Sequence, residues 1–385
     1  MDDLGRYDAI VLGAGVIGAS TAWHLVQAGL SVALVDAEGP AAAASGASDG
    51  AVSVASKKPG PLARLATASL LYTRNLAADG PLMHGYHPRP TYIFGSGPAE
   101  GAAIDALIAK LDALGDAVRL RRDGAADLLP GTGASVERLV ELTGEGHMPG
   151  YVAVAGYLRD PRIVKIWPAR VRGLEETDAG VIVDLGTRRL HASRVIAALG
   201  VSTTTLFPQM PVIPRAGQLF VTDRGAPGAL PGALTSAAYL LAKTTDMTAL
   251  PRPPVVIDPL STGQYLIGST REDHADPGRV DFATLQKLMT RAAETWPALR
   301  NRRVIRAFAG VRAAVSDGLP IVGLAPGSTR VTLATGFEGD GICLSAVIGR
   351  EVARMAADEA PTPALSGDLA ALAPTRFTAL QEGAA

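Results

Sequence analysis

The chain contains a single cysteine, Cys343, among its 385 residues. One thiol excludes an intrachain disulfide and any metal or iron–sulfur site built on paired cysteines. His84 and His87 are close in sequence, but no carboxylate or third histidine supports them as metal ligands. We therefore expect no metal site.

Net charge and long apolar runs are also lacking. The 36 Lys and Arg residues against 37 Asp and Glu leave a formal charge of −1, which argues against a nucleic-acid or anionic-membrane partner. No apolar run approaches the roughly 20 residues of a membrane-spanning helix. The acidic N-terminus is not typical of a signal peptide, so we expect a cytoplasmic protein without a transmembrane segment.

What the composition does favour is a compact globular enzyme, with 48% hydrophobic and 19% charged residues. The length allows two or three domains with a large buried core. Apolar periodicity predicts helices and strands along most of the chain. We expect helices over residues 62–76, 102–114, 282–296 and 345–357, and strands over residues 171–175, 181–184, 190–191, 194–200, 213–222, 255–257, 264–269, 321–323 and 331–334.

The most informative motif is a glycine-spaced turn near the start of the chain. An apolar run leads into Gly13-x-Gly15-x-x-Gly18, a helical pattern follows, and a second apolar run ends on Asp36. Gly13 permits the tight turn, Gly15 lets a pyrophosphate approach the backbone, and Gly18 lets the helix pack on the strand. Asp36 is placed to accept hydrogen bonds from an adenosine ribose. This pattern predicts dinucleotide binding.

The glycine motif alone leaves NAD and FAD open, and three later features favour FAD. The small residues Ser45–Gly50 follow the second strand and offer backbone N–H groups, although an ordinary flexible loop has the same composition. A late apolar strand ends at Gly200. The Gly339-Asp-Gly341 turn precedes the last helix, whose positive end could face a group that becomes negative on reduction. The same turn could simply start that helix.

In this order, the motifs resemble the FAD-dependent amino-acid oxidase and dehydrogenase family, which includes D-amino-acid, glycine and sarcosine oxidases and the flavin subunits of opine, hydroxyproline and proline dehydrogenases. The resemblance covers most of the chain and also rests on Pro214–Gln218, Tyr265–Thr270, Arg306–Arg312, Ser316–Gly323 and Thr335–Ile342. It implies an α/β fold with a Rossmann-like FAD-binding domain on a parallel sheet and a second, antiparallel-sheet substrate domain. The chain would pass between them more than once, with residues 1–80, 157–210 and 308–385 in the first domain and residues 81–156 and 211–307 in the second.

The glycine motif and the resemblance together give the expected FAD-binding residues. They occupy the early turn, the end of the second strand, the small-residue loop, the late strand, and the closing turn with its helix. They are Gly13, Gly15, Val16, Ile17, Gly18, Asp36, Ala37, Ser45, Gly46, Ala47, Ser48, Gly50, Ala198, Gly200, Gly310, Gly339, Asp340, Gly341 and Ile342.

The resemblance implies removal of hydride from the α-carbon of a small amino or imino acid to flavin N5, giving an imine that hydrolyses. A D-amino acid, a hydroxyproline-like imino acid or an opine would suit. Arg312 matches the family's Gly-x-Arg motif, and an arginine fork suits a substrate carboxylate. An ion pair of Arg312, for example with Asp317, is the structural alternative. Arg215 and Tyr265 are weaker candidates with a structural role favoured, and Cys343 suits burial at a helix start.

The chain departs from the family pattern between Gly156–Pro161 and the next strand, residues 163–166. A parallel crossover takes about a dozen residues, and hardly any remain here. We expect apolar surface to be uncovered there, with a partner subunit as its cover. The functional alternatives are a flavin-binding subunit that is weakly active or inactive, and an NAD-dependent dehydrogenase. The enantiomer and the electron acceptor stay open.

Overall fold

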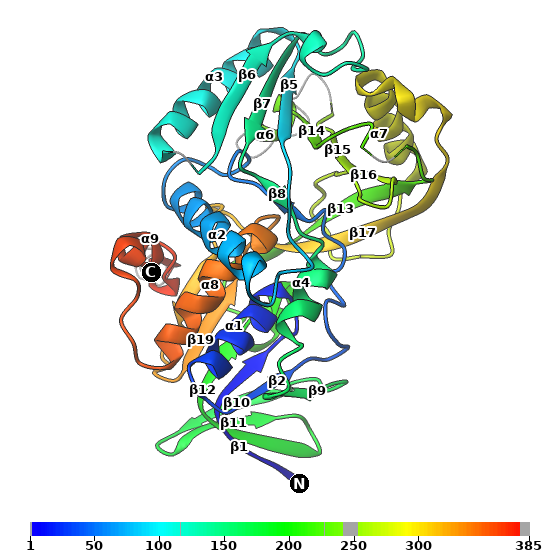
Figure 1. Ribbon diagram of the computed structural model, residues 1–385. Helices are drawn as coiled ribbons and strands as arrows, with labels where there is room; N and C mark the ends of the chain where they lie inside the picture. The colour runs from blue at the N-terminus through cyan, green and yellow to red at the C-terminus, as the bar shows by residue number, and fades with distance from the viewer. Residues whose placement is uncertain (1, 116, 227, 242–252, 378–385) are drawn as a thin grey trace, which may run out of the picture.

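The chain forms two lobes, each built on one large sheet (Figure 1). The computed structural model describes residues 2–115, 117–226, 228–241 and 253–377. The described strands form two eight-stranded sheets and one three-stranded sheet. The expected domains also include residues 1, 116, 227, 242–252 and 378–385, which lie outside the described residues.

The sheet of the lower lobe has a parallel centre in the order β9-β2-β1-β12-β19. An antiparallel strand, β18, pairs with β19, and a hairpin of β10 and β11 pairs with β12. The bounds are β1 (Asp2–Leu12), β2 (Val32–Val35), β9 (Ile163–Ile166), β10 (Gly173–Thr177), β11 (Gly180–Asp184), β12 (Arg188–Ala197), β18 (Ile321–Leu324) and β19 (Val331–Thr335). The expected strands over residues 190–191 and 194–200 are thus one strand, β12.

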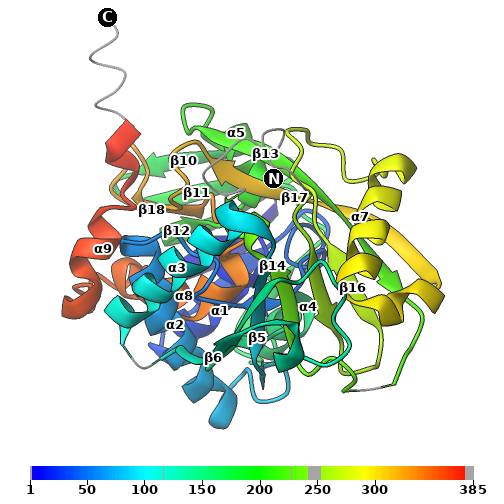
Figure 2. The ribbon, with the colours of Figure 1, turned by 90° about the horizontal axis from the view of Figure 1, so that it is seen from above.

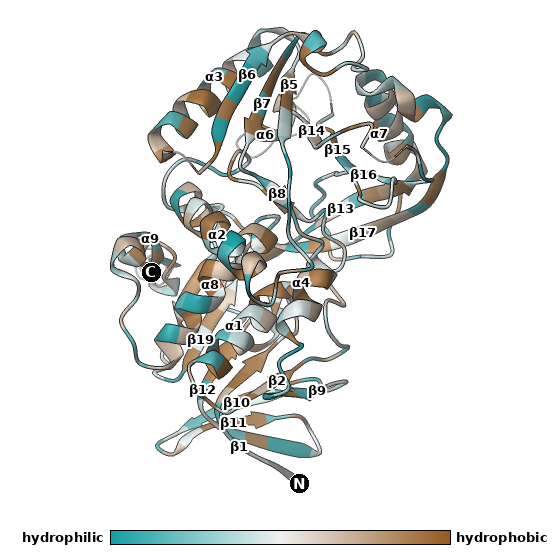
Figure 3. Ribbon diagram, in the orientation of Figure 1, coloured by the Kyte–Doolittle hydropathy of each residue, from teal (hydrophilic) through white to brown (hydrophobic). Residues whose placement is uncertain are grey.

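Residues 9–12 of β1 and all of β2 are buried and apolar. Helices cover one face of this sheet. They are α1 (Val16–Gln27), α2 (Pro61–Ala78) and α8 (Gly341–Ala356), with the short α9 (Ser366–Ala370) beside α2. A Cβ on Gly349 of α8 would lie 2.2 Å from Ser20 Oγ of α1, so glycine sets the close approach of these two helices. Figure 3 shows hydrophobic residues concentrated in the strands and helices at the centre of this lobe.

The upper lobe is built on a sheet in the order β17-β13-β16-β15-β14-β5-β7-β6. Its neighbours are antiparallel except for β14 and β5. The bounds are β5 (Thr91–Gly95), β6 (Arg119–Gly124), β7 (Arg138–Thr143), β13 (Val212–Thr222), β14 (Ala233–Ser236), β15 (Val256–Pro259), β16 (Tyr265–Gly268) and β17 (Val304–Val315), with α3 (Gly97–Leu114), α6 (Ala237–Leu241) and α7 (Phe282–Thr295) around it. The short α5 (Thr203–Leu206) follows β12.

Two long strands join the lobes. β13 and β17 are antiparallel and pair over the whole length of β13, from Val212 to Thr222. Figure 2 shows them crossing the molecule between α7 and the helices α2 and α3. Ala313 and Val315, at the end of β17, belong to the same buried cluster as Ile10 and Leu12 of β1. A small sheet of β3 (Ala51–Val52), β8 (Gly146–His147) and β4 (His87–Pro88) lies at the same junction.

A helix covers part of the surface expected to be uncovered near residues 156–166, while Tyr151 and Val164 are 61% and 42% exposed. The helix that leads to β9 is α4 (Gly150–Tyr157), which runs into the Gly156–Pro161 turn, and β9 then pairs in parallel with β2. Ala153, Val154 and Tyr157 of α4 lie in the same buried cluster as Leu25 of α1. The prediction did not foresee this helix because it expected the crossover after the turn, and a one-sided apolar pattern is hard to see in eight mostly apolar residues.

Membrane-spanning helices and metal clusters are both absent from the described part of the chain. None of its helices has both the length and the apolar character needed to cross a bilayer. Over the same residues, His, Cys, Asp and Glu form no group of three or more that could hold a metal ion.

Candidate active site

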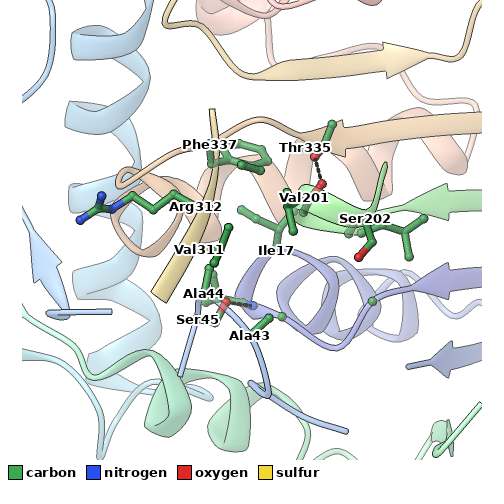
Figure 4. A pocket seen from close by; sticks show the side chains of 18 of the residues that line it. Ile17, Ala43, Ala44, Ser45, Val201, Ser202, Val311, Arg312, Thr335 and Phe337 are labelled. Carbon is green, nitrogen blue, oxygen red and sulfur yellow. Dashed lines mark hydrogen bonds between the residues drawn. The ribbon is translucent and has the colours of Figure 1, made fainter. Parts of the chain in front are cut away.

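A cavity of about 430 Å³ lies where the two lobes meet. Its walls come from the ends of β1, β2, β12 and β19 in the lower lobe and from β13 and β17 in the upper lobe. Figure 4 shows Ile17, Val201, Val311 and Phe337 around it, with Ser45 near the start of α1. The cavity thus connects the early glycine turn with the strand that carries Arg312.

The glycine turn forms one end of this cavity. Gly13 has φ +104°, and a Cβ there would lie 2.4 Å from the Ala198 carbonyl oxygen, so only glycine fits. Gly15 precedes α1, whose first turn contains no acidic residue. The Val16 N–H donates to Ser45 Oγ at 3.0 Å, which fixes the small-residue loop against the helix start. The positive end of α1 therefore faces the cavity, and no acidic residue of its own first turn opposes it.

Asp36 lies beside this turn at the end of β2. Its Oδ2 accepts the Ala14 N–H at 2.7 Å, and its Oδ1 accepts the N–H groups of Glu38 and Gly39, each at 2.8 Å. These bonds hold the carboxylate in place against the cavity wall. Asp36 therefore joins the glycine turn to the segment after β2, at the position expected for contact with a ribose.

Most of the predicted site residues line the cavity. They are Gly13, Gly15, Val16, Ile17, Asp36, Ala37, Ser45, Ala47, Ser48, Ala198, Gly200, Gly310, Arg312, Gly339, Gly341 and Ile342. Gly18, Gly46, Gly50 and Asp340 do not line it. A Cβ on Gly18 would lie 1.9 Å from the Gly13 carbonyl oxygen, and one on Gly46 would lie 2.2 Å from the Ala41 carbonyl oxygen. A Cβ on Gly50 would lie 2.8 Å from His147 Nε2, so all three glycines allow close packing.

Asp340 is turned into the protein, where it pairs with Lys57. Lys57 Nζ lies 2.9 Å from Asp340 Oδ1, and the two side chains are 3% and 10% exposed. Burial by itself lowers the pKa of Lys57, but the charge and hydrogen bond of Asp340 more than reverse this, so the pKa is raised. Cys343, two residues into the same helix, is fully buried, and burial raises its pKa to about 11.

These residues fit a bound dinucleotide. The starts of α1 and α8 both border the cavity, and neither helix has an acidic residue in its first turn. The Asp340 carboxylate before α8 is paired with Lys57, so it does not oppose an anionic group there. Two positive helix ends and a wall of glycine, alanine and serine suit a diphosphate and a flat ring system.

Arg312 lies at the other end of the cavity. Its Nη2 donates to Ser269 Oγ at 2.6 Å, and its Nη1 to the carbonyl of Thr270 at 3.3 Å. Asp317 pairs with Arg376 at 2.8 Å, so the expected alternative partner of Arg312 is engaged elsewhere. Among the described residues, no carboxylate forms an ion pair with Arg312. Figure 4 shows its side chain extending away from Val201 and Ser202.

Tyr239 of α6 lies beside Arg312. The Tyr239 hydroxyl and Arg312 Nε are each 4.0 Å from the position of a Cβ on Gly339. Burial raises the pKa of Tyr239, Arg312 opposes the rise, and the carboxylates of Asp49, Asp340 and Glu338 add to it. The phenol is therefore protonated at neutral pH, and the residue lines this part of the cavity.

The weaker candidates lie outside the cavity lining. Arg215 pairs with Asp273 at 2.9 Å, and Tyr265 is packed in the core of the upper lobe, 4% exposed. Several lining residues were missed. Asp49 lies inside the Ser45–Gly50 loop, where the signal of the sequence is its small residues and not its acid. Tyr239, Ser269 and residues 169–172 carry no motif that places them at the cavity.

Comparison with known proteins gives one family match, to the model described as "DAO: FAD dependent oxidoreductase", over residues 8–355. Among curated relatives, the glycine oxidase of Bacillus licheniformis is 23% identical, over 91% of this chain and 93% of its own. An opine oxidase subunit of Rhizobium meliloti is 25% identical, over 82% of this chain and 84% of its own.

A third relative is longer than this chain. The tRNA 5-methylaminomethyl-2-thiouridine biosynthesis bifunctional protein MnmC of Maricaulis maris is 28% identical over 95% of this chain, which spans 54% of that protein. Among solved structures, glycine oxidase from Geobacillus kaustophilus superposes with a TM-score of 0.84 at 21% identity, covering 96% of this chain and 99% of its own. This likeness supports the two-lobed α/β fold.

Proposed function

Because the chain belongs to the DAO family of FAD-dependent oxidoreductases, we propose that it oxidises a small amino or imino acid at the bond between the α-carbon and nitrogen. The cofactor is FAD, so the nicotinamide alternative falls away. Candidate substrates are a D-amino acid, a hydroxyproline-like imino acid or an opine. The names of two curated relatives, a glycine oxidase and an opine oxidase subunit, support this substrate class.

The observation that carries the proposal is the position of Arg312. Its guanidinium lines the cavity, is held by a hydroxyl and backbone carbonyls, and has no carboxylate partner among the described residues. A buried or half-buried cation without a counter-ion is costly, and a carboxylate ligand relieves that cost through two parallel charge-assisted hydrogen bonds. The site is therefore complementary to a carboxylic acid at this end.

The chain's own residues would act by placing the substrate. Arg312 would bind the carboxylate, Ser269 would fix the guanidinium, and the Tyr239 hydroxyl would donate a second hydrogen bond from the same side. Bound FAD supplies a two-electron acceptor for this oxidation. Residues at the starts of α1 and α8 and in the Ser45–Gly50 loop would hold it. Such placement accounts for much of an enzyme's rate enhancement when the cofactor provides the chemistry.

The division of labour between the lobes forms part of the proposal. Residues 1–80, 157–210 and 308–385 would bind FAD, and residues 81–156 and 211–307 would close the substrate end. A partner subunit is also proposed, on the grounds that two curated relatives are named as subunits, one of an opine oxidase and one of the hydrogen cyanide synthase of Pseudomonas aeruginosa. Light scattering of the chain expressed alone and with candidate partners tests this part.

The decisive experiment is anaerobic reduction of the flavin by candidate substrates. The purified holoprotein would be mixed with glycine, sarcosine, D-amino acids, prolines and opines, and the flavin absorbance followed near 450 nm. We expect bleaching with at least one amino or imino acid, and a keto or aldehyde product after hydrolysis. A holoprotein that dithionite bleaches but no member of the panel bleaches would instead be the inactive-subunit alternative.

A further inference from the structure

Asp49 brings a negative charge into the same cavity. Its Oδ1 accepts the Ala51 N–H at 3.1 Å, and among the described residues no cation forms an ion pair with its carboxylate. The backbone of this residue is fixed from the other side, because His147 Nε2 bonds the Asp49 carbonyl oxygen at 3.0 Å. The carbonyl can only accept, so His147 Nε2 carries the proton. The Asp49 carboxylate is thus carried on a backbone that is fixed from both sides.

Two other acids of the cavity wall, Glu338 and Asp36, already have partners, and a third, Glu38, is exposed to solvent after β2. Glu338 lies 2.7 Å from Arg271, and the Asp36 carboxylate accepts three backbone N–H groups. The cation near the Asp49 loop, Arg89, is engaged by the buried carboxylate of Asp258 and by the Pro259 carbonyl at 2.6 Å. Asp49 therefore differs from Glu338 in having no cation, among the described residues, that balances its charge.

Asp49 and Arg312 belong to the same end of the cavity. Both line the cavity, and the segments that carry them are in contact: a Cβ on Gly310, two residues before Arg312 on β17, would lie 2.7 Å from the Cβ of Ala47, two residues before Asp49. Both charges also act on the Tyr239 phenol, where Arg312 lowers and Asp49 raises the pKa that burial has already raised. The cavity end consequently presents one cation and one anion, neither paired within the described residues, around a neutral phenol. Two opposite fixed charges are complementary to a zwitterion, and they discriminate against a ligand that carries only one of its charges.

We propose that Asp49 binds the amino group of the substrate while Arg312 binds its carboxylate. This inference rests on the proposed function and names what makes the site selective for amino acids over other carboxylic acids. A hydrogen bond from the substrate nitrogen to Asp49 would fix the direction of the nitrogen relative to the α-carbon. The same carboxylate would repel the carboxylate of a ligand that lacks nitrogen, since the two like charges would share one cavity.

The test compares pairs of ligands that differ only in the amino group, such as glycine with acetate, D-alanine with propionate, and proline with cyclopentanecarboxylate. Dissociation constants for amino acids come from the saturation of the anaerobic reduction rate, and those for the acids from titration of the flavin absorbance. The variant is Asp49→Asn, whose amide oxygen can still accept the Ala51 N–H. The matched control is Glu338→Gln, which changes a carboxylate of the same cavity that has a cation partner.

In Asp49→Asn we expect amino-acid binding to weaken by about 10- to 100-fold, the effect of losing a hydrogen bond to a charged group. Binding of the nitrogen-free acid should stay the same or tighten, so the ratio of the two constants should change by at least about tenfold. Glu338→Gln should leave that ratio within about twofold, because it alters binding of both ligands of a pair alike.

Two results would overturn the assignment of Asp49. One is an unchanged ratio in Asp49→Asn with normal flavin content, and the other is an effect confined to substrates with a cationic side chain. Failure of the proposed function has a different signature, since the unmodified holoprotein would then be reduced by no amino acid in the panel.

Discussion

Arg312 is the residue on which substrate binding is proposed to depend. Replacing it with alanine removes the cation at the substrate end but leaves both helix starts and the Asp36 carboxylate untouched. We expect Arg312→Ala to retain its flavin and to lose about 3–5 kcal/mol of transition-state stabilisation, the range for unpairing a buried charge. The measurement is kcat/KM with the substrate found in the reduction panel, together with the flavin-to-protein ratio.

A matched control lies on the same strand. Arg306 is exposed on β17 and stacks over the Phe308 ring at 5.3 Å from its centroid, so Arg306→Ala changes the charge of β17 without reaching the cavity. We expect near-normal efficiency from that variant. If Arg312→Ala were as active as the unmodified protein, Arg312 would have to be reassigned to a structural role.

Two glycines of the early turn, Gly15 and Gly18, should differ in whether they serve cofactor binding or the stability of the fold. A Cβ on Gly15 would lie 3.2 Å from Ser45 Oγ, at the cavity wall, where the small hydroxyl can move aside. A Cβ on Gly18 would lie 1.9 Å from the Gly13 carbonyl oxygen, which forces helix and strand apart. We therefore expect Gly15→Ala to weaken FAD retention with little change in stability, and Gly18→Ala to destabilise the fold by at least about 2 kcal/mol.

Cofactor titration of the apoprotein and its urea unfolding separate these two effects. Equal losses of stability in both variants would contradict the assignment of Gly15 to the cofactor wall.

At the scale of elements, one ion pair fastens the loop after β3 to the start of α8. Lys57 and Asp340 are both buried, and Lys110 Nζ donates to the carbonyls of Ala55 and Lys57 at 2.6 and 3.0 Å, which holds the loop further. Removing only one partner of a buried pair leaves an uncompensated charge. We expect Lys57→Met to lower the free energy of unfolding by about 3–5 kcal/mol.

The double variant Lys57→Met with Asp340→Leu should recover part of that loss, because no lone charge is then buried. Urea unfolding of the apoproteins gives the comparison, and Lys58→Met is the control, because Lys58 has no ion pair with a described carboxylate. A double variant less stable than Lys57→Met would show that the pair has another structural role.

The sequence predicted correctly those elements that are specified by residues close together in the chain. The turn Gly13–Gly18, the strand before it and the helix after it follow from glycine spacing and apolar periodicity, and they lie where expected. The helix expected over residues 345–357, α8, begins at Gly341, because its first turn is buried and apolar and shows no one-sided pattern. The same lack of pattern hid α4.

At the scale of the whole molecule, the resemblance conveyed the fold, including a parallel sheet and a second sheet, but not the side-chain neighbours at their junction. Asp49, Tyr239 and Ser269 come together only because β13, β17 and α6 bring the upper lobe onto the Ser45–Gly50 loop. Their distance in sequence leaves no spacing rule from which their proximity could be derived. Long-range packing, and not propensity, places them.

The buried titratable groups predict how the stability of the whole molecule depends on pH. Burial lowers the pKa of His24 to about 4 and that of His147 to about 3, from 6.5, and raises the pKa of Asp258 to about 6, from 3.8. Between about pH 4 and 6 the unfolded chain then binds two protons on the histidines that the folded chain does not bind. Over the same pH range the folded chain keeps a proton on Asp258, whereas in the unfolded chain that carboxyl has lost its proton.

The unfolded state therefore binds one more proton over this interval, so the free energy of unfolding should rise by about 1.4 kcal/mol per pH unit between about pH 4 and 6. In His24→Asn one of the two histidine protons is lost, the counts become equal, and the dependence should nearly vanish. The exposed His84 provides the control, since His84→Gln should keep the slope of the unmodified protein. Urea unfolding at half-unit steps of pH measures all three, and a slope in His24→Asn equal to that of the unmodified protein would show that His24 is not held neutral by burial.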